Sequence, residues 1–149
     1  MTMRTPHRGM SLAFLSGAAF LCGGCGVAVI SKSADVNAAD TNLAMIGRLY
    51  VLAEQKLARP PKNADELKPF LDAGTDLNQL LISPNDNQPY VIVWGAKVVN
   101  ASDQSMIVAY ERTGANGYRR VFTPAGTGML AAEAFAKSSF PPGHTPGGS

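Results

Sequence analysis

Two cysteines are the most reactive side chains of this 149-residue chain. They stand in the run Cys22-Gly23-Gly24-Cys25, which has the Cys-x-x-Cys spacing of redox and metal sites. A redox motif of this kind needs a strand before it and a helix after it, because that setting lowers the pKa of one thiol. An apolar segment precedes Cys22 instead, and no further cysteine or histidine pair completes a zinc site. We therefore expect neither a metal nor another cofactor.

The two histidines offer little catalytic chemistry. His7 lies in the N-terminal segment, and His144 lies in residues 141–149, whose sequence PPGHTPGGS is typical of a disordered tail. A serine or cysteine nucleophile needs a histidine or another base beside it. Because the folded part of the chain holds no histidine in this interpretation, we expect no catalytic residues and a protein that is not an enzyme.

The carboxylates have structural explanations. Asp65 and Glu66 begin a short predicted helix, where acids stabilise the helix dipole and cap the free N–H groups. Glu111 ends a predicted strand, and we expect it to form a surface pair with Arg119 or Arg120 across a hairpin.

Residues 83–89 form a predicted loop of the sequence SPNDNQP, and Asp86 lies at its centre. Its alternating Asn and Asp oxygens could contribute to a calcium site, but turn formation accounts for the same residues and the ligand count is low. Trp94, Tyr90 and Tyr110 could form a recognition surface, whereas their placement in strands favours packing in the core.

The first 24 residues have the order of a secretory signal. Arg4 and Arg8 are followed by an apolar run at residues 10–21 and then by small residues. That run is short for a bilayer crossing, which takes about 20 residues. Two of the 13 basic residues lie in this segment and none of the 11 acidic ones, so the remaining chain has no formal net charge. A neutral domain does not attract a phosphate backbone, and we expect no nucleic-acid partner.

The end of the segment resembles a bacterial lipoprotein signal, in which a small residue precedes a cysteine that becomes the lipidated N-terminus. Gly24 and Cys25 occupy these two positions, although Cys22 stands where that family has an aliphatic residue. The resemblance implies cleavage between Gly24 and Cys25 and a lipid on Cys25. Two alternatives remain open, namely ordinary cleavage slightly downstream and an uncleaved transmembrane anchor, since residues 27–30 extend the apolar stretch to about 20 residues.

After the signal, we expect a lipidated cysteine and polar tether at residues 25–39, a globular domain at 40–140 and the tail at 141–149. Asp40 or Thr41 caps a helix that ends near Leu57, and a second, short helix opens at Asn63 and is limited by Pro69. The apolar stripe of the first helix predicts one buried face; it consists of Leu43, Ile46, Leu49, Tyr50, Ala53 and Leu57.

The second half of the domain has the pattern of strands. Residues 90–94, 106–110 and 118–122 are rich in β-branched and aromatic side chains. A hairpin at residues 114–117 joins the last two, and the turn at 124–128 leads into a short fourth strand. A final helix at residues 132–137 places Phe135 on the sheet. These elements predict an α+β domain whose helices pack on one face of an antiparallel sheet of three to four strands. The longer helices are N-terminal, and the last helix is short and C-terminal.

Three segments together resemble the globular part of type II secretion pseudopilins and of planctomycete pilin-like secreted proteins. These segments are residues 42–47 (NLAMIG), 83–92 (SPNDNQPYVI) and 107–111 (IVAYE), followed by the last strand pair and helix. The family assembles through a long N-terminal helix with a prepilin cleavage site and a glutamate near its start. Neither occurs here, which argues against filament assembly by that route.

The leading hypothesis is a lipoprotein of the cell envelope, exported and anchored to a membrane by its lipid. Its domain would bind another envelope or secretion-system protein without acting as an enzyme. A small solute-binding or carboxylate-based enzyme module is the alternative, and it predicts a concave pocket with convergent acids of shifted pKa. A diverged pseudopilin-like subunit is the third possibility.

Overall fold

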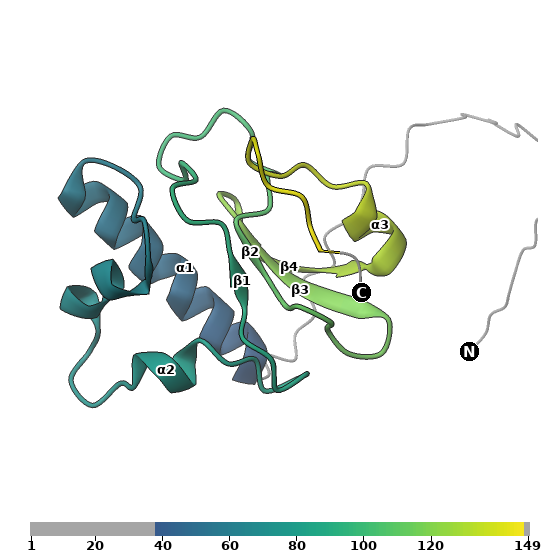
Figure 1. The fold of residues 1–149 in the computed structure, drawn as a ribbon, viewed down its shortest axis with the longest axis horizontal. Helices are drawn as coiled ribbons and strands as arrows, with labels where there is room; N and C mark the ends of the chain where they lie inside the picture. The colour runs from purple at the N-terminus through teal and green to yellow at the C-terminus, as the bar shows by residue number, and fades with distance from the viewer. Residues whose placement is uncertain (1–37, 148–149) are drawn as a thin grey trace, which may run out of the picture.

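The computed structural model describes residues 38–147, which fold into helices and one sheet (Figure 1). Four strands form this sheet in the order β1-β2-β3-β4, and every neighbouring pair is antiparallel. The predicted α+β class, with N-terminal helices, a small antiparallel sheet and a short C-terminal helix, is confirmed. The elements in chain order are α1 (Ala38–Leu57), the 3-10 helix η1 (Ala64–Phe70), α2 (Leu77–Leu80), β1 (Val91–Ile92), β2 (Ala109–Tyr110), β3 (Tyr118–Thr123), β4 (Gly126–Ala131) and α3 (Ala132–Ala136).

Helix α1 lies across the sheet and buries its predicted stripe, except at its end. Leu57 is 37% exposed because the helix stops there and Ala58 takes a positive φ of 54°. The helix begins at Ala38, so Asp40 lies in its first turn and is not the predicted cap; a carboxylate in that turn still stabilises the helix dipole. The other members of the stripe are buried, namely Leu43, Ile46, Leu49, Tyr50 and Ala53.

Gly47 allows α1 to approach the sheet closely. A Cβ atom at this position would lie 2.3 Å from a ring carbon of Phe122, which is shorter than any normal carbon contact. Because Phe122 is itself buried, its ring has little room to move. The glycine therefore sets the distance between helix and sheet.

The second predicted helix forms as η1, a 3-10 helix that contains Pro69. Asn63 caps the start of η1 as predicted, because its Oδ1 accepts from Glu66 N at 3.3 Å. The Glu66 carboxylate accepts in return from Lys62 N at 2.9 Å, one residue before the cap. The same carboxylate forms two hydrogen bonds of 2.9 Å with Arg59. These contacts fasten η1 to the end of α1.

The two faces of the sheet carry different clusters of buried side chains. Phe122 of β3 faces α1, and the adjacent Val121 faces the other way and packs with Phe135 of α3. The expectation that the helices share one face is therefore wrong for α3, because Phe135 follows β4 directly and folds back beneath the sheet. Each face of this small sheet thus has its own apolar cover.

Strands β1 and β2 are shorter than the predicted strands at 90–94 and 106–110, whereas β4, which was predicted to be short, has six residues. Residues 90–94 contribute only β1, because Gly95 takes a positive φ of 82° and Trp94 leaves the sheet to stack on Tyr50, with ring centroids 6.1 Å apart. The predicted hairpin before β3 is confirmed: Asn116 and Gly117 have φ values of 54° and 78°, as a tight two-residue turn requires.

Candidate functional site

The most completely buried acid of the domain, Glu111, lies just after β2 and is 1% exposed. Its Oε1 accepts from Ser83 Oγ at 2.9 Å and from Asn85 Nδ2 at 2.7 Å. Its Oε2 accepts from Arg120 N at 2.9 Å. A buried carboxylate is costly unless its lone pairs are occupied, and these three donors occupy both oxygens. The predicted surface pair with an arginine side chain is wrong, because the loop at residues 83–89 covers Glu111.

Asp86 joins the same loop to the hairpin before β3. Its Oδ2 accepts from Thr113 N at 2.9 Å, Thr113 Oγ1 at 3.0 Å and Gly114 N at 2.9 Å, while Oδ1 accepts from Gln88 N at 3.1 Å. Partial burial opposes ionisation of Asp86, but these hydrogen bonds outweigh it and hold the pKa below its ordinary value. The expected turn role accounts for the contact with Gln88 N inside the loop. The three contacts with Thr113 and Gly114 join the loop to another segment and were not predicted.

Arg120 links the sheet to the start of α1. Its guanidinium pairs with the Asp40 carboxylate, and its Nε is buried without a hydrogen-bond partner among the described residues. Tyr90 Oη donates to Ala39 O at 3.1 Å beside this pair. Burial raises the pKa of Tyr90 to about 12. A hydrogen bond with Ser83 lowers this pKa, and the negative charge of Glu111 raises it. The phenol therefore stays neutral and acts as a donor.

These groups form one polar centre where the loop at 83–89, the sheet and α1 meet. Ser83 is 0% exposed and Glu111 is 1% exposed, so a substrate cannot reach the Ser83–Glu111 pair in this conformation. The arrangement satisfies buried polar groups and fixes three segments against one another. The sequence does not predict this centre, because the loop at 83–89, Glu111, Arg120 and Asp40 are far apart along the chain.

A second buried acid has the same kind of role near the C-terminal end of α1. Glu54 is 6% exposed, and its Oε2 accepts from Val98 N at 2.9 Å and from Val99 N at 3.0 Å. Tyr50 Oη, one turn earlier, donates to Ala96 O at 2.8 Å, and burial raises the pKa of this phenol far above its ordinary range. Helix α1 thereby holds the long loop between β1 and β2.

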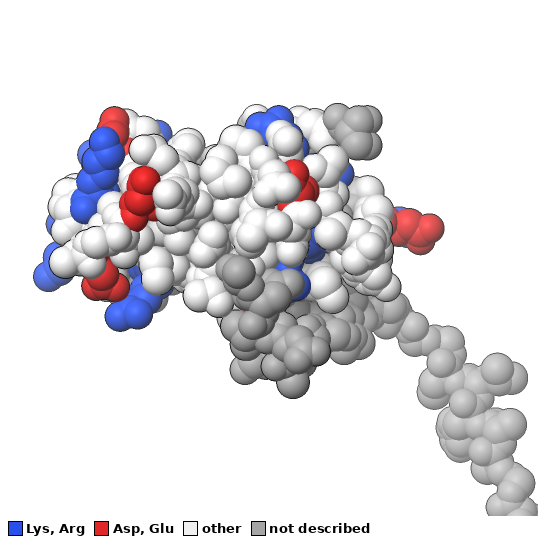
Figure 2. Space-filling view, turned by 90° about the horizontal axis from the view of Figure 1, so that it is seen from below, with Lys and Arg blue, Asp and Glu red and all other residues white. Residues whose placement is uncertain are grey.

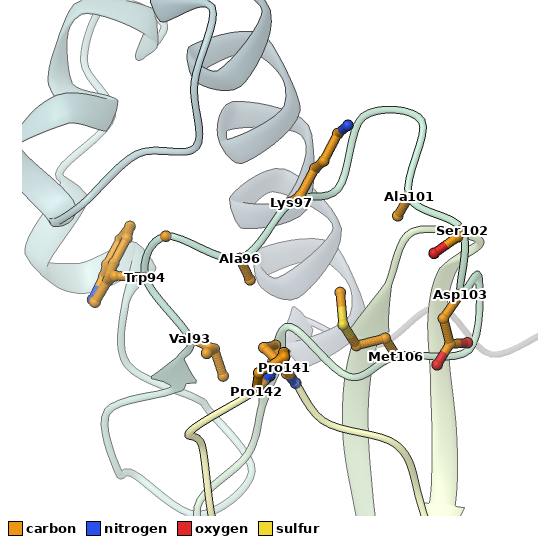
Figure 3. Close-up of a pocket in the computed structure, with 11 residues that line it drawn as sticks. Val93, Trp94, Ala96, Lys97, Ala101, Ser102, Asp103, Met106, Pro141 and Pro142 are labelled. Carbon is orange, nitrogen blue, oxygen red and sulfur yellow. The ribbon is translucent and has the colours of Figure 1, made fainter.

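That loop also borders a shallow pocket of about 320 Å³ (Figure 3). Its centre is apolar, with Ala96, Met106 and Pro141 close together, while the Lys97 amine points away from them. Asp103 lies at the rim, and hydrogen bonds from Ser105 hold its pKa below the ordinary value, so it stays ionised and is a poor proton donor. The pocket therefore combines an apolar centre with the charged residues Lys97 and Asp103 in its lining.

The C-terminal residues 141–147 lie against the sheet, where we had expected a disordered tail. His144 Nε2 and Tyr110 Oη are 3.1 Å apart, and the ring of Phe140 packs edge-on against Tyr110 at 5.9 Å. Pro141 is buried. This corrects the prediction of a tail for these residues and the expectation that the folded part holds no histidine. The aromatic Phe140 just before the Pro-Gly stretch was the signal that could have revealed it.

Burial raises the pKa of the Tyr110 phenol, against the opposing charges of Arg119 and Arg112. Tyr110 is 2% exposed, and its partly buried contact with His144 lies beside the rings of Phe135 and Phe140. Tyr110 of β2 thus contacts α3 through Phe135, with ring centroids 4.9 Å apart, and the C-terminal segment through His144. Within residues 38–147 no group of three or more histidine, cysteine or acidic side chains is placed to hold a metal ion.

The remaining predicted site residues lie outside the described part of the chain. Gly24, Cys25 and the Cys-x-x-Cys run of which they are part belong to residues 1–37. Lipidation at Cys25, cleavage after Gly24 and the signal itself therefore stay predictions. Between residues 38 and 147, no helix is long and apolar enough to cross a membrane.

Among the described residues, the face shown in Figure 2 has no patch of charge of one sign, because basic and acidic side chains are mixed on it. Basic and acidic side chains gather together at the end of the molecule where α1 ends and η1 lies, and most of the remaining face is uncharged. In η1, Lys68 pairs with Asp65 at 2.6 Å, and both side chains are exposed. Such pairs are solvated surface features that contribute little free energy.

Comparisons with protein-family models, with curated proteins and with solved structures find no match to this chain. The resemblance to lipoprotein signals and to pseudopilin domains stays a prediction from the sequence.

Proposed function

We propose that this protein is an exported lipoprotein of the cell envelope, tethered to a membrane through a lipid on Cys25. Its folded domain acts as a non-enzymatic binding or structural module for another envelope or secretion-system protein. The order of positive, apolar and small residues before Cys25 supports export. Residues 26–37, which separate Cys25 from α1, are long enough to hold the domain away from the bilayer.

One observation carries the non-enzymatic part of the proposal. Glu54 and Glu111, the buried acids of the described domain, accept hydrogen bonds from the protein itself, Glu54 through Oε2 and Glu111 through both carboxylate oxygens. A general acid or base must reach a substrate proton, and these carboxylates are enclosed. Their contacts stiffen the loops between strands, which suits a domain that presents a fixed surface to a partner.

Mass spectrometry of the mature protein tests the anchor. We expect a chain that starts at Cys25 and carries a diacylglyceryl group, and we expect it to sediment with membranes. Cys25→Ser should remove both the lipid mass and the sedimentation. Cys22→Ser is the matched control and should leave both unchanged, because residue 22 lies in the removed segment. A mature mass without lipid, or a chain that starts further downstream, would contradict the anchor.

The binding role is tested separately by chemical cross-linking of the full chain in intact cells. We expect a discrete cross-linked product with an envelope protein, and we expect Cys25→Ser to lose it if the tether brings the two proteins together. A second outcome is that the lipidated protein sediments with membranes and yet forms no cross-link to another protein. That result would contradict the binding role and leave the anchor intact.

The apolar pocket favours a second candidate function, the binding of a small solute. Trp94 lines this pocket and is the single tryptophan of the chain, so its fluorescence reports occupancy directly. A saturable change of Trp94 emission on addition of a small apolar solute would support this candidate. Met106→Lys should abolish that change, because it places a charge at the centre of the pocket.

A further inference from the structure

Strand β4 is an edge of the sheet, with β3 on one side and no strand on the other among the described residues. It is six residues long, from Gly126 to Ala131, and pairs with β3 over its whole length. The opposite edge, β1, has only two residues. The sheet therefore presents one long open edge.

The hydrogen bonds of β3 show which groups of β4 face outward. The carbonyls of Arg120 and Phe122 accept from the β2 side, from Glu111 N at 3.0 Å and from Val108 N at 2.8 Å. In an antiparallel pair, opposite residues either exchange hydrogen bonds or both turn away. Met129 is opposite Arg120, and Thr127 is opposite Phe122. Their N–H and C=O groups therefore point away from β3.

By the alternation of the strand, the N–H of Ala131 points the same way. We call the outward backbone groups of Thr127, Met129 and Ala131 the β4 edge. The hydrogen bonds of the described residues place no partner on these groups. Thr127 and Ala131 are exposed and Met129 is half-buried, so the β4 edge is accessible.

Natural sheets protect a long edge with lysine, proline, a bulge or a covering segment. The sequence GTGMLA of β4 has no charged residue and no proline, and its register with β3 is unbroken from Gly126 to Ala131. An open edge of this kind accepts an extended strand through backbone hydrogen bonds.

We propose that the β4 edge binds the β4 edge of a second copy of this chain. A two-fold axis through Met129 makes the two edges antiparallel, so that the two Met129 residues exchange both hydrogen bonds. The same register sets Thr127 of one copy opposite Ala131 of the other. The side chains that meet are uncharged and of moderate size, so no like charges or bulky groups oppose each other. The product is one continuous sheet of two domains.

This pairing is independent of the lipid anchor and of any heterologous partner. It is tested by disulfide cross-linking of the full chain in detergent. Paired Cα atoms at Met129 would lie about 5.5 Å apart, within the range that a disulfide bridges. Met129→Cys should therefore give several-fold more oxidised dimer than the unsubstituted chain, which reports any background from Cys22 and Cys25. Ala44→Cys, on the exposed side of α1, is the matched control and should stay at background.

The register is tested by mixing two variants. Thr127→Cys and Ala131→Cys should each stay at background alone, because equal positions away from the axis lie about 13 Å apart in the antiparallel register. A mixture of the two should form a cross-linked dimer that contains one of each. Met129→Lys, which keeps the β3 pairing but adds a like charge at the axis, should remove the dimer from sedimentation profiles.

Three results would overturn the proposal. Equal cross-linking of Met129→Cys and Ala44→Cys would show that the β4 edge is not the contact. Cross-linking of Thr127→Cys to itself would indicate a parallel arrangement or an antiparallel register with its axis at Thr127, and either contradicts the proposed register. Cross-linking of Met129→Cys to a different protein in cells, with no dimer, would assign the edge to a heterologous strand.

Discussion

At the scale of single residues, the acids of this domain are explained by the groups that donate to them. Glu111 meets a serine, an asparagine and a backbone N–H, and Glu54 meets two backbone N–H groups of one loop. Removing such an acceptor leaves several buried donors unsatisfied, and each unsatisfied donor costs about 1–3 kcal/mol. The acids therefore stabilise the fold through the loops that they hold.

Glu111→Ala should lower the free energy of unfolding by roughly 3 kcal/mol, because three donors lose their acceptor and the site is left partly empty. Glu133→Ala, at an exposed position of α3, should change it by less than about 0.5 kcal/mol. Urea unfolding followed by circular dichroism measures both. Equal midpoints for the two variants would contradict the structural role of Glu111.

The Arg59–Glu66 pair gives a dependence on pH. The hydrogen bonds from Arg59, and next the one from Lys62 N, lower the pKa of Glu66 from 4.5 to about 2. Since the folded state holds the carboxylate ionised, its contribution is complete above about pH 4.5 and is lost as the pH falls through about 2. Glu66→Gln should therefore flatten the fall of Tm between these values. If the Tm of this variant falls with pH as steeply as that of the unsubstituted chain, Glu66 is not the group responsible.

At the scale of elements, packing decides outcomes that helix propensity would not. In an isolated helix, alanine is more favourable than glycine by about 1 kcal/mol. At position 47 the added methyl group would collide with the buried ring of Phe122, and overpacking of a core costs roughly 1–3 kcal/mol. The contact between α1 and β3 outweighs the local preference.

Gly47→Ala should therefore destabilise the protein by about 1–2 kcal/mol, despite the better helix former. The double variant Gly47→Ala with Phe122→Leu should lose less than the sum of the single variants, because the smaller side chain leaves room for the methyl group. Thermal unfolding of the four proteins completes the cycle. Simple additivity would show that the two positions do not contact each other.

The C-terminal segment forms a further testable element. Deleting residues 141–149 removes the buried Pro141 and the contact of His144 with Tyr110, and should lower stability by roughly 1–2 kcal/mol. Amide exchange in β2 should accelerate with it. His144→Ala, which keeps Pro141 in place, should give a smaller loss. A deletion without effect on either measurement would show that the segment adds nothing to the fold.

At the scale of the whole molecule, periodicity was sufficient to predict the class and order of elements. The stripe on α1, the short strands and the Asn116-Gly117 turn all depend on local sequence. The burial of Glu111 could not be predicted, because its cover comes from Asn85 and Ser83, more than twenty residues earlier in the chain. The place of α3 on the second face was missed for the same reason, since only the sheet defines the two faces.

Net charge gives a measurement on the intact protein. The complete chain has a sequence pI of about 8.6, whereas a chain that starts at Cys25 loses Arg4 and Arg8 and becomes formally neutral at pH 7. Isoelectric focusing of the protein from cells should therefore place it well below 8.6. Protein produced without export serves as the reference. Co-migration of the two forms would indicate an uncleaved segment.

The first turn of α1 carries a mechanical consequence. Any pull from the preceding residues enters the domain at Ala38, and Asp40 and Ala39 are fastened there to Arg120 and Tyr90 of the sheet side. A force applied along the chain would thus act first on the Asp40–Arg120 ion pair and on the hydrogen bond from Tyr90 to Ala39, and only then on the helix. Arg120→Met should make the domain yield at a lower force in a pulling experiment, with the rupture starting at its amino-terminal end.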